Sequence, residues 1–195
     1  MSEFEIITIT LSFIVGLGIA QLLSSFGAAV RNRTEHALHW MPFFWGMAIL
    51  LFSVQYWFAL YDLNYVLKDW SWGWYAQMLV LAIALYLAGT LVLPNRAATK
   101  RGSLLEDFNA TGRYSLLALM AYILGWIPAN AKLEGGNWAA EGNLVNLAMA
   151  SIILFAYRSR SSRARLILTV FFYLIFGYAL VALYSTPGAR NSPSI

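Results

Sequence analysis

Five side-chain amides stand well inside otherwise apolar stretches of this sequence, and a sixth, Asn130, stands at the end of another such stretch. The five are the groups in these stretches that are best able to bind a polar ligand. They are Gln21, Gln55, Gln77, Asn143 and Asn146. An amide in hydrocarbon without hydrogen-bond partners is costly, so these groups should converge on one another or on water. We therefore expect a polar cavity that opens toward the outer side of a membrane. The alternative is that the amides form hydrogen bonds between neighbouring helices.

Ionisable groups are missing from the same apolar stretches. The lysines Lys68, Lys100 and Lys132 all fall outside them, and no Asp or Glu lies well inside one. Ionisable residues at mid-membrane mark proton relays and coupling sites, so a proton-coupled transporter is disfavoured. The sequence also lacks a Gly-rich phosphate loop, a His-Glu-x-x-His motif and a Gly-x-Ser-x-Gly motif. We expect no enzymatic activity and no cofactor.

The two histidines, His36 and His39, lie three residues apart with Glu35 beside them. This spacing can place two metal ligands on one helical turn. However, no further histidine and no cysteine exists to complete a ligand set. We interpret both as histidines at the cytoplasmic membrane boundary, and we expect no metal site.

The elements that must position the amides are membrane-spanning helices. Of 195 residues, 60% are hydrophobic and 11% are charged, against about 25% charged in soluble domains. A span needs about 20 apolar residues. We predict an all-α polytopic membrane protein, with six transmembrane helices in one bundle that forms a single domain over residues 1–195. The predicted spans are Ile6–Val30, Met41–Tyr61, Trp72–Leu93, Tyr114–Ala131, Trp138–Tyr157 and Leu166–Tyr184.

The positive charges predict the orientation. Ten of the thirteen Lys and Arg residues fall in the first, third and fifth loops, and cytoplasmic loops retain positive charge. Both termini should therefore lie outside the cytoplasm. This pattern explains the net charge of +4 without a nucleic-acid partner. A cytoplasmic protein or anionic lipid that binds the chain should contact these three loops.

The first predicted span carries a ladder of small side chains at four-residue spacing. Its members are Thr8, Ser12, Gly16, Ala20, Ser24 and Ala28, with Gly27 beside them. Small residues allow close helix approach in membranes. We expect this helix at the centre of the bundle, with its opposite arc facing lipid. That arc consists of Leu11, Val15, Ile19, Leu22 and Phe26. Because such ladders also serve between protomers, we expect a homo-oligomer.

Tryptophans lie near the predicted ends of several spans. Trp70, Trp72 and Trp74 open the third span, and Trp126 and Trp138 flank the fourth loop. We interpret them as an interfacial belt. A carbohydrate-stacking surface is the alternative for the first three.

The third loop, Pro94 to Gly112, is the one long connection. Within it, Ser103 could cap a short helix with Leu104, Leu105 and Phe108 on one side. We expect either a segment lying in the inner headgroup region or an ordered loop with no membrane role.

Four short motifs resemble a group of small, uncharacterised bacterial inner-membrane proteins. They are the run Gly16–Leu23, the pair His39-Trp40, the run Val54–Phe58 and the pair Leu93-Pro94. The resemblance covers the first half of the chain. It implies a bacterial inner membrane, hence periplasmic termini, and it draws attention to Gln21 and Gln55. It implies no particular activity.

Two functions remain open. The first is a small oligomeric channel or passive transport unit built around the first helix. The alternative is a membrane-embedded interaction or sensory subunit whose basic loops bind a cytoplasmic partner or anionic lipid. A channel needs a continuous polar path, whereas a subunit should be dry inside. An enzyme acting on lipid is disfavoured, because a nucleophile with its base and a metal set are both missing.

Overall fold

The computed structural model describes residues 3–31, 39–67, 69–93, 104–159 and 161–183. All regular secondary structure in these residues is helical, which confirms the all-α prediction. The long helices are α1 (Glu3–Arg31), α2 (Trp40–Val66), α3 (Trp72–Leu91), α5 (Tyr114–Gly125), α7 (Glu141–Arg158) and α8 (Ser162–Tyr178). The short elements are α4 (Leu104–Asp107), the π-helices η1 (Phe108–Gly112) and η2 (Ala179–Leu183), and α6 (Ile127–Leu133).

Five helical segments of the described chain are long and apolar enough to cross a membrane. They are Phe4–Arg31, Trp40–Val66, Trp72–Leu91, Tyr114–Leu133 and Ser162–Ala182. The protein therefore has the character of a multi-pass membrane protein, with one such helix fewer than the six predicted. The missing one is α7, whose 18 residues include Glu141, two asparagines and Arg158. Its length and composition alone do not qualify it as a span.

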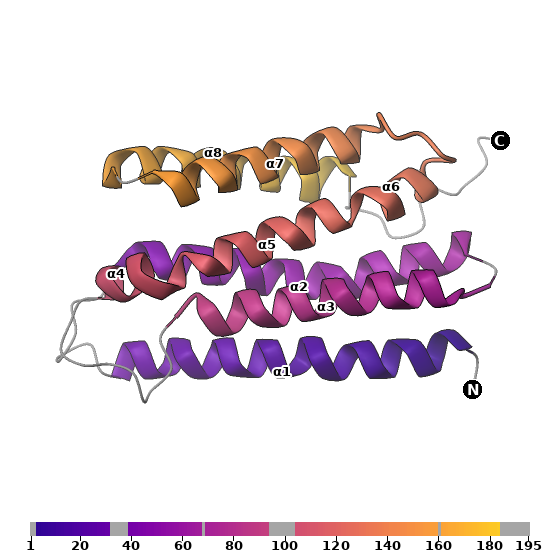
Figure 1. The fold of residues 1–195 in the computed structure, drawn as a ribbon, viewed down its shortest axis with the longest axis horizontal. Helices are drawn as coiled ribbons and strands as arrows, with labels where there is room; N and C mark the ends of the chain where they lie inside the picture. The colour runs from indigo at the N-terminus through magenta and orange to yellow at the C-terminus, as the bar shows by residue number, and fades with distance from the viewer. Residues whose placement is uncertain (1–2, 32–38, 68, 94–103, 160, 184–195) are drawn as a thin grey trace.

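The long helices lie side by side and reverse direction at each connection (Figure 1). The row α1, α3, α5, α7 and α8 is formed by contacts between successive members. Helix α2 packs across this row against α1, α3 and α6. Aromatic contacts also join α2 to α5, through Phe52 and Tyr122, and to α8, through Trp45 and Phe172. The core thus lies around α2 and α5.

Helix α1 lies at one edge of the molecule (Figure 1). Its principal contacts are with α2 and α3. The expectation that this helix stands at the centre is wrong; α2 takes that place, with Trp45, Ile49, Tyr56 and Leu60 all buried. Large side chains can fill the space among several neighbouring helices, whereas a ladder of small residues has little surface to bury there.

The inward face of α1 is the one that was expected to face lipid. Leu11, Val15 and Leu22 are at most 1% exposed, so that prediction is wrong for these three residues. Their side chains fit between α2 and α3, which is the packing that dense cores require.

The small-residue ladder of α1 makes few contacts within the chain. Ala20, Ser24 and Gly27 are exposed, Ser12 and Gly16 are half-buried, and Ala28 is buried. A Cβ atom added to Gly16 or Gly27 would meet nothing within 4 Å. Ser12 is the exception, because its Oγ accepts a hydrogen bond from Trp57 Nε1 at 2.9 Å.

Helices α1 and α3 approach each other closely on another arc, at Gly18 and Gly89. A Cβ atom on Gly18 would stand 3.1 Å from the Cα of Tyr86, and one on Gly89 would stand 3.3 Å from the carbonyl oxygen of Gly18. Glycine therefore lets these two helices touch through their backbones, as in other membrane helix pairs.

Substituting Gly18 should destabilise the protein, whereas the same change two residues earlier should not. We expect Gly18→Val to cost about 1–3 kcal/mol, because the added side chain forces the α3 backbone away. In a chain of this length, each kcal/mol lost from the free energy of unfolding lowers the Tm by roughly 2–4 °C, and this shift can be measured in detergent. Gly16→Val is the matched control and should leave the Tm within about 1–2 °C of wild type. Equal losses in both variants would show that helix propensity, not contact with Tyr86, is responsible.

The described part of the third loop packs against the long helices. Leu104 and Phe108 are 3% and 1% exposed, and α4 contacts α2. The expectation that this apolar side lies among headgroups is therefore wrong for these two residues. Their burial in the protein removes more apolar surface from water than the interface would. Ser103 lies outside the described residues.

The two ends of the molecule differ in charge. One end, called the basic end here, carries the described residues Arg31, Arg113, Arg158, Arg163 and Arg165, together with the two acidic residues Glu106 and Asp107 of α4. The opposite end carries Asp62, Asp69, Glu134 and Glu141, with Lys132 among them. This separation follows from the alternating direction of the helices and the loop charges noted above.

Candidate functional site: a polar cavity beside a broken helix

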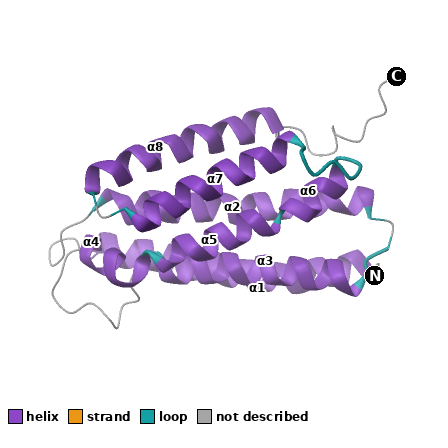
Figure 2. Ribbon diagram, turned by 45° about the horizontal axis from the view of Figure 1, so that its top comes forward, coloured by secondary structure: helices purple, strands orange, loops and turns teal. Residues whose placement is uncertain are grey.

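The predicted fourth span is interrupted in its second half. Helix α5 ends at Gly125, Trp126 forms a turn, and α6 begins at Ile127. Figure 2 shows the break as a loop between the two helices. Pro128 is the physical cause, because its ring removes a backbone donor and clashes with the preceding turn. Carbonyl groups freed by such a break need other partners inside a membrane.

Two of the five amides donate to carbonyl groups at this break. Gln77 on α3 donates from Nε2 to the carbonyl oxygen of Gly125 at 2.9 Å. Asn146 on α7 donates from Nδ2 to the carbonyl oxygen of Ile123 at 3.2 Å. The broken helix is therefore held from both sides by side chains distant in sequence.

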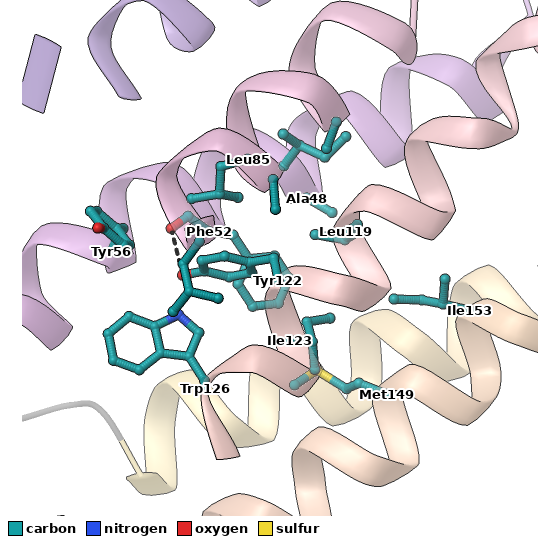
Figure 3. Packing of buried hydrophobic residues seen from close by; sticks show 14 of the residues in the cluster. Ala48, Phe52, Tyr56, Leu85, Leu119, Tyr122, Ile123, Trp126, Met149 and Ile153 are labelled. Atoms are coloured by element: carbon teal, nitrogen blue, oxygen red, sulfur yellow. Dashed lines mark hydrogen bonds between the residues drawn. The ribbon is translucent and has the colours of Figure 1, made fainter. Parts of the chain in front are cut away.

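A cavity of about 20 Å³ adjoins the break. Its lining comes from α2, α5, α6, α7, α8 and η2, and its polar members are Gln55, Tyr122, Trp126, Asn130 and Asn146. Figure 3 shows the ring of Tyr122 on α5 close to that of Trp126 in the turn after it, with Ile123 and Met149 next to them; the two rings meet edge to face. A space of this size accommodates about one water molecule.

Three atoms of this lining are buried without a hydrogen-bond partner in the protein. They are the acceptor Gln55 Oε1 and the donors Trp126 Nε1 and Asn130 Nδ2. An unsatisfied buried polar group costs about 1–3 kcal/mol. The lining therefore suits an occupant that both donates and accepts hydrogen bonds, as water does.

The structure brings together only part of the predicted amide set. Gln55 and Asn146 line the cavity, and Gln77 lies at the break beside it. Asn143 instead donates to the carbonyl oxygen of Trp138 at 3.1 Å, just before its own helix. Gln21 is half-buried on the edge helix α1 and does not line the cavity.

Trp126 joins this site although the sequence suggested an interfacial position for it. Its side chain is 6% exposed, whereas that of Trp138 is 66% exposed. The interfacial interpretation of Trp126 is therefore wrong. The signal was Pro128, since a proline inside a span marks the point where backbone and neighbouring side chains turn inward.

An aromatic cluster lies between the cavity and the basic end. Phe52 and Phe176 have ring centroids 4.5 Å apart, and those of Trp45 and Phe172 are 4.9 Å apart. All four side chains are at most 4% exposed. Packed rings of this kind exclude water, so the cavity is closed on this side.

His39 serves as a helix cap. Its Nδ1 accepts a hydrogen bond from the backbone N–H of Met41 at 3.2 Å, at the start of α2. Partial burial, followed by the positive charge of Arg165, lowers the pKa of His39 below its usual 6.5. Glu35 and His36 lie outside the described residues, and within the described ones no three metal-ligating side chains gather.

The lowered pKa of His39 makes stability depend on pH. The unfolded chain takes up a proton near pH 6.5, while the folded chain takes it up only at lower pH, so acidification favours unfolding in that window. We expect the Tm in detergent to fall between about pH 7.5 and about pH 5. His39→Asn retains a capping acceptor without titrating, so its Tm should fall less. The same fall in both proteins would assign the effect to other groups.

Comparison of the chain with family models, curated proteins and solved structures gives no match. The resemblance to small bacterial inner-membrane proteins therefore stays a prediction.

Proposed function

We propose that this protein is a non-enzymatic passive transport unit of the bacterial inner membrane, and that the cavity at Gln55 is its solute site. The observation that carries the proposal is a broken helix beside a cavity with unpartnered donors and acceptors. In membranes, interrupted helices are found where backbone and side chains line a pathway for solute.

The proposal counts α7 as the sixth span. This helix lies between α5 and α8 along the length of the molecule (Figure 1). Its amides are sheltered, since Asn143 is 1% exposed and Asn146 is 4% exposed. Polar residues are tolerated in a span when they face protein. With six spans and a cytoplasmic basic end, both termini are periplasmic.

The proposed solute is small and neutral. The residues that line the cavity include no Asp, Glu, Lys, Arg or His. An ion that left water here would lack charge compensation, whereas a neutral solute needs only hydrogen bonds. Water is the smallest candidate, and urea and glycerol are the next test solutes.

Passage toward the basic end requires the aromatic cluster to move. We place the hinge at Trp126 and Pro128, because a helix break concentrates bending at a few residues. The exposed ladder of α1 supplies the surface for a second copy of the chain, in keeping with the expected oligomer.

The test is solute flux through the purified protein in liposomes of neutral lipid. Osmotic shock with stopped-flow light scattering measures the permeability to water, urea and glycerol, with protein-free liposomes as the reference. A protein-dependent rise for at least one solute supports the proposal. Permeability equal to that of protein-free liposomes for all three overturns it.

The aromatic cluster also favours a second candidate, a membrane-embedded interaction or sensory subunit. Phe52, Phe172 and Phe176 make the interior between cavity and basic end dry, and a subunit needs no open path. Crosslinking in intact membranes separates the candidates: a subunit gives a defined product with a different protein, while a transport unit gives products of this chain alone.

A further inference from the structure

A second pocket, of about 250 Å³, lies at the basic end. It is formed where η1 and the start of α5 face the end of α7 and the first turn of α8. Its polar lining consists of Asn109, Arg113, Tyr157, Ser159 and Arg165. The residues that line it contribute two guanidinium groups and no acidic side chain; the nearest acidic residue in the sequence is Asp107, which directly precedes Phe108.

Arg113 is held in place by aromatic rings. Its guanidinium carbon lies 5.5 Å from the ring centroid of Tyr114 and 5.5 Å from that of Tyr157. Ring contacts of this kind engage the flat face of a guanidinium. The N–H groups at its edge remain suited to a planar or tetrahedral anion.

Arg165 is held by a neutral partner. Its Nη1 donates a hydrogen bond to Oδ1 of Asn109, and its Nε is buried without a partner. An amide fixes the direction of the side chain but leaves its positive charge uncompensated. The buried N–H of Arg165 therefore calls for an anionic acceptor.

The first turn of α8 adds to the positive potential. Ser161 caps this helix by accepting a hydrogen bond from the N–H of Ala164 at 3.4 Å, and both Ser159 and Arg165 line the pocket. The N-terminus of a helix carries partial positive charge and attracts phosphate. Two arginines and this helix end thus act on one space.

The remaining lining is apolar. Phe108, Leu116 and Ala156 are buried, and they border the same pocket. A free phosphate ion makes no favourable contact with an apolar surface, whereas the carbon atoms of a phospholipid's glycerol backbone do. The pocket lies at the ends of membrane-length helices, where headgroups are found.

We propose that this pocket binds the phosphate of an anionic phospholipid from the leaflet at the basic end. Arg113 and Arg165 hold the phosphate oxygens from two sides, as arginines do in other phosphate sites. The apolar lining receives the glycerol backbone. This assignment does not depend on transport, because it concerns a different pocket and is measured by binding.

The test compares lipid binding by wild type and three charge variants. Arg113→Gln and Arg165→Gln each remove one guanidinium of the pocket. Arg163→Gln is the matched control, because Arg163 is exposed on the same first turn of α8 and does not line the pocket. Each protein is placed in phosphatidylcholine nanodiscs with or without phosphatidylglycerol, and the Tm and retained lipid are measured by thermal unfolding and native mass spectrometry.

Wild type and Arg163→Gln should retain phosphatidylglycerol and gain Tm from it, since a ligand that binds only the folded state stabilises it. Arg113→Gln and Arg165→Gln should lose at least about tenfold in affinity. Equal losses in Arg163→Gln would overturn the proposal in favour of diffuse surface attraction. No lipid-dependent gain in wild type would also overturn it.

Two further measurements test the phosphate contact itself, one with soluble phosphate and one with a variant that retains the charge. Inorganic phosphate added to phosphatidylcholine nanodiscs should not raise the Tm; a rise that disappears in Arg113→Gln would assign the pocket to soluble phosphate and overturn the lipid assignment. Arg165→Lys retains the charge, so it should bind more lipid than Arg165→Gln. If Arg165→Lys binds as little lipid as Arg165→Gln while its Tm without phosphatidylglycerol equals that of wild type, the proposed phosphate contact is wrong.

Discussion

Gln55→Leu should abolish most of the protein-dependent solute flux and leave the protein as stable as wild type. The Oε1 atom of Gln55 is a buried acceptor without a protein partner at the cavity wall. Leucine has nearly the same size and no acceptor, so a passing solute loses one hydrogen bond. A loss of about 1–3 kcal/mol in the narrow part of the path lowers flux roughly 5- to 150-fold.

The stability of Gln55→Leu should not fall, because the Oε1 atom that it removes has no hydrogen-bond partner in the protein. Removing an unsatisfied buried acceptor relieves a desolvation penalty in the folded state, so the Tm should stay within about 2 °C of wild type or rise. Gln21→Leu is the control, because it makes the same chemical change on α1 away from the cavity. Flux that falls equally in both variants would remove the cavity from the transport path.

Gln77→Leu should show the reverse behaviour. The Nε2 of Gln77 donates to the carbonyl oxygen of Gly125, where Pro128 breaks the helix. Without this donor the carbonyl has no partner from α3, and inside a membrane it has no bulk water to replace it. We expect a loss of about 1–2 kcal/mol in the free energy of unfolding, seen as a Tm lower by roughly 2–8 °C.

Flux through folded Gln77→Leu should remain within about threefold of wild type, because this side chain does not line the cavity. Measurements at a temperature well below both transitions separate flux from unfolding. Gln55→Leu serves as the stability control for an amide-to-leucine change of the same kind. If Gln77→Leu is as stable as wild type, the hydrogen bond from α3 to the break does not contribute to stability.

Together these two variants separate the alternatives that the amides left open. Gln77 donates a hydrogen bond between two helices, whereas Gln55 lines the cavity. Asn146 belongs to both, since it lines the cavity and donates to Ile123. For this reason we expect its replacement to lower both stability and flux, so this variant cannot distinguish the two alternatives.

The sequence by itself determined the helical class and the rough extents of the membrane-length helices. Long apolar runs bounded by charged loops have no other stable arrangement in lipid, because every backbone polar group must be satisfied locally. Pro128 also marked the fourth predicted span, and the break at Trp126 lies beside it. The separation of charge between the two ends was readable too, since it depends only on which loops carry arginine.

Only the tertiary structure decided which face of each helix turns inward. Apolar side chains suit lipid and protein interior equally well, so Leu11 and Val15 carried no signal that they pack against α2 and α3. The close contact between α1 and α3 likewise lies at Gly18 and Gly89. Its position depends on where the two backbones meet in the folded protein, and the small-residue ladder of α1 did not indicate it.

The grouping of polar side chains was also a tertiary property. Gln55, Asn130 and Asn146 come from α2, α6 and α7, and no local pattern states that these helices meet at one cavity. The same holds for Arg113 and Arg165, which are separated by more than a full span in sequence and line one pocket. Hydrogen bonding in lipid requires polar groups to find partners, but the packing of large side chains around α2 decides which partners lie within reach.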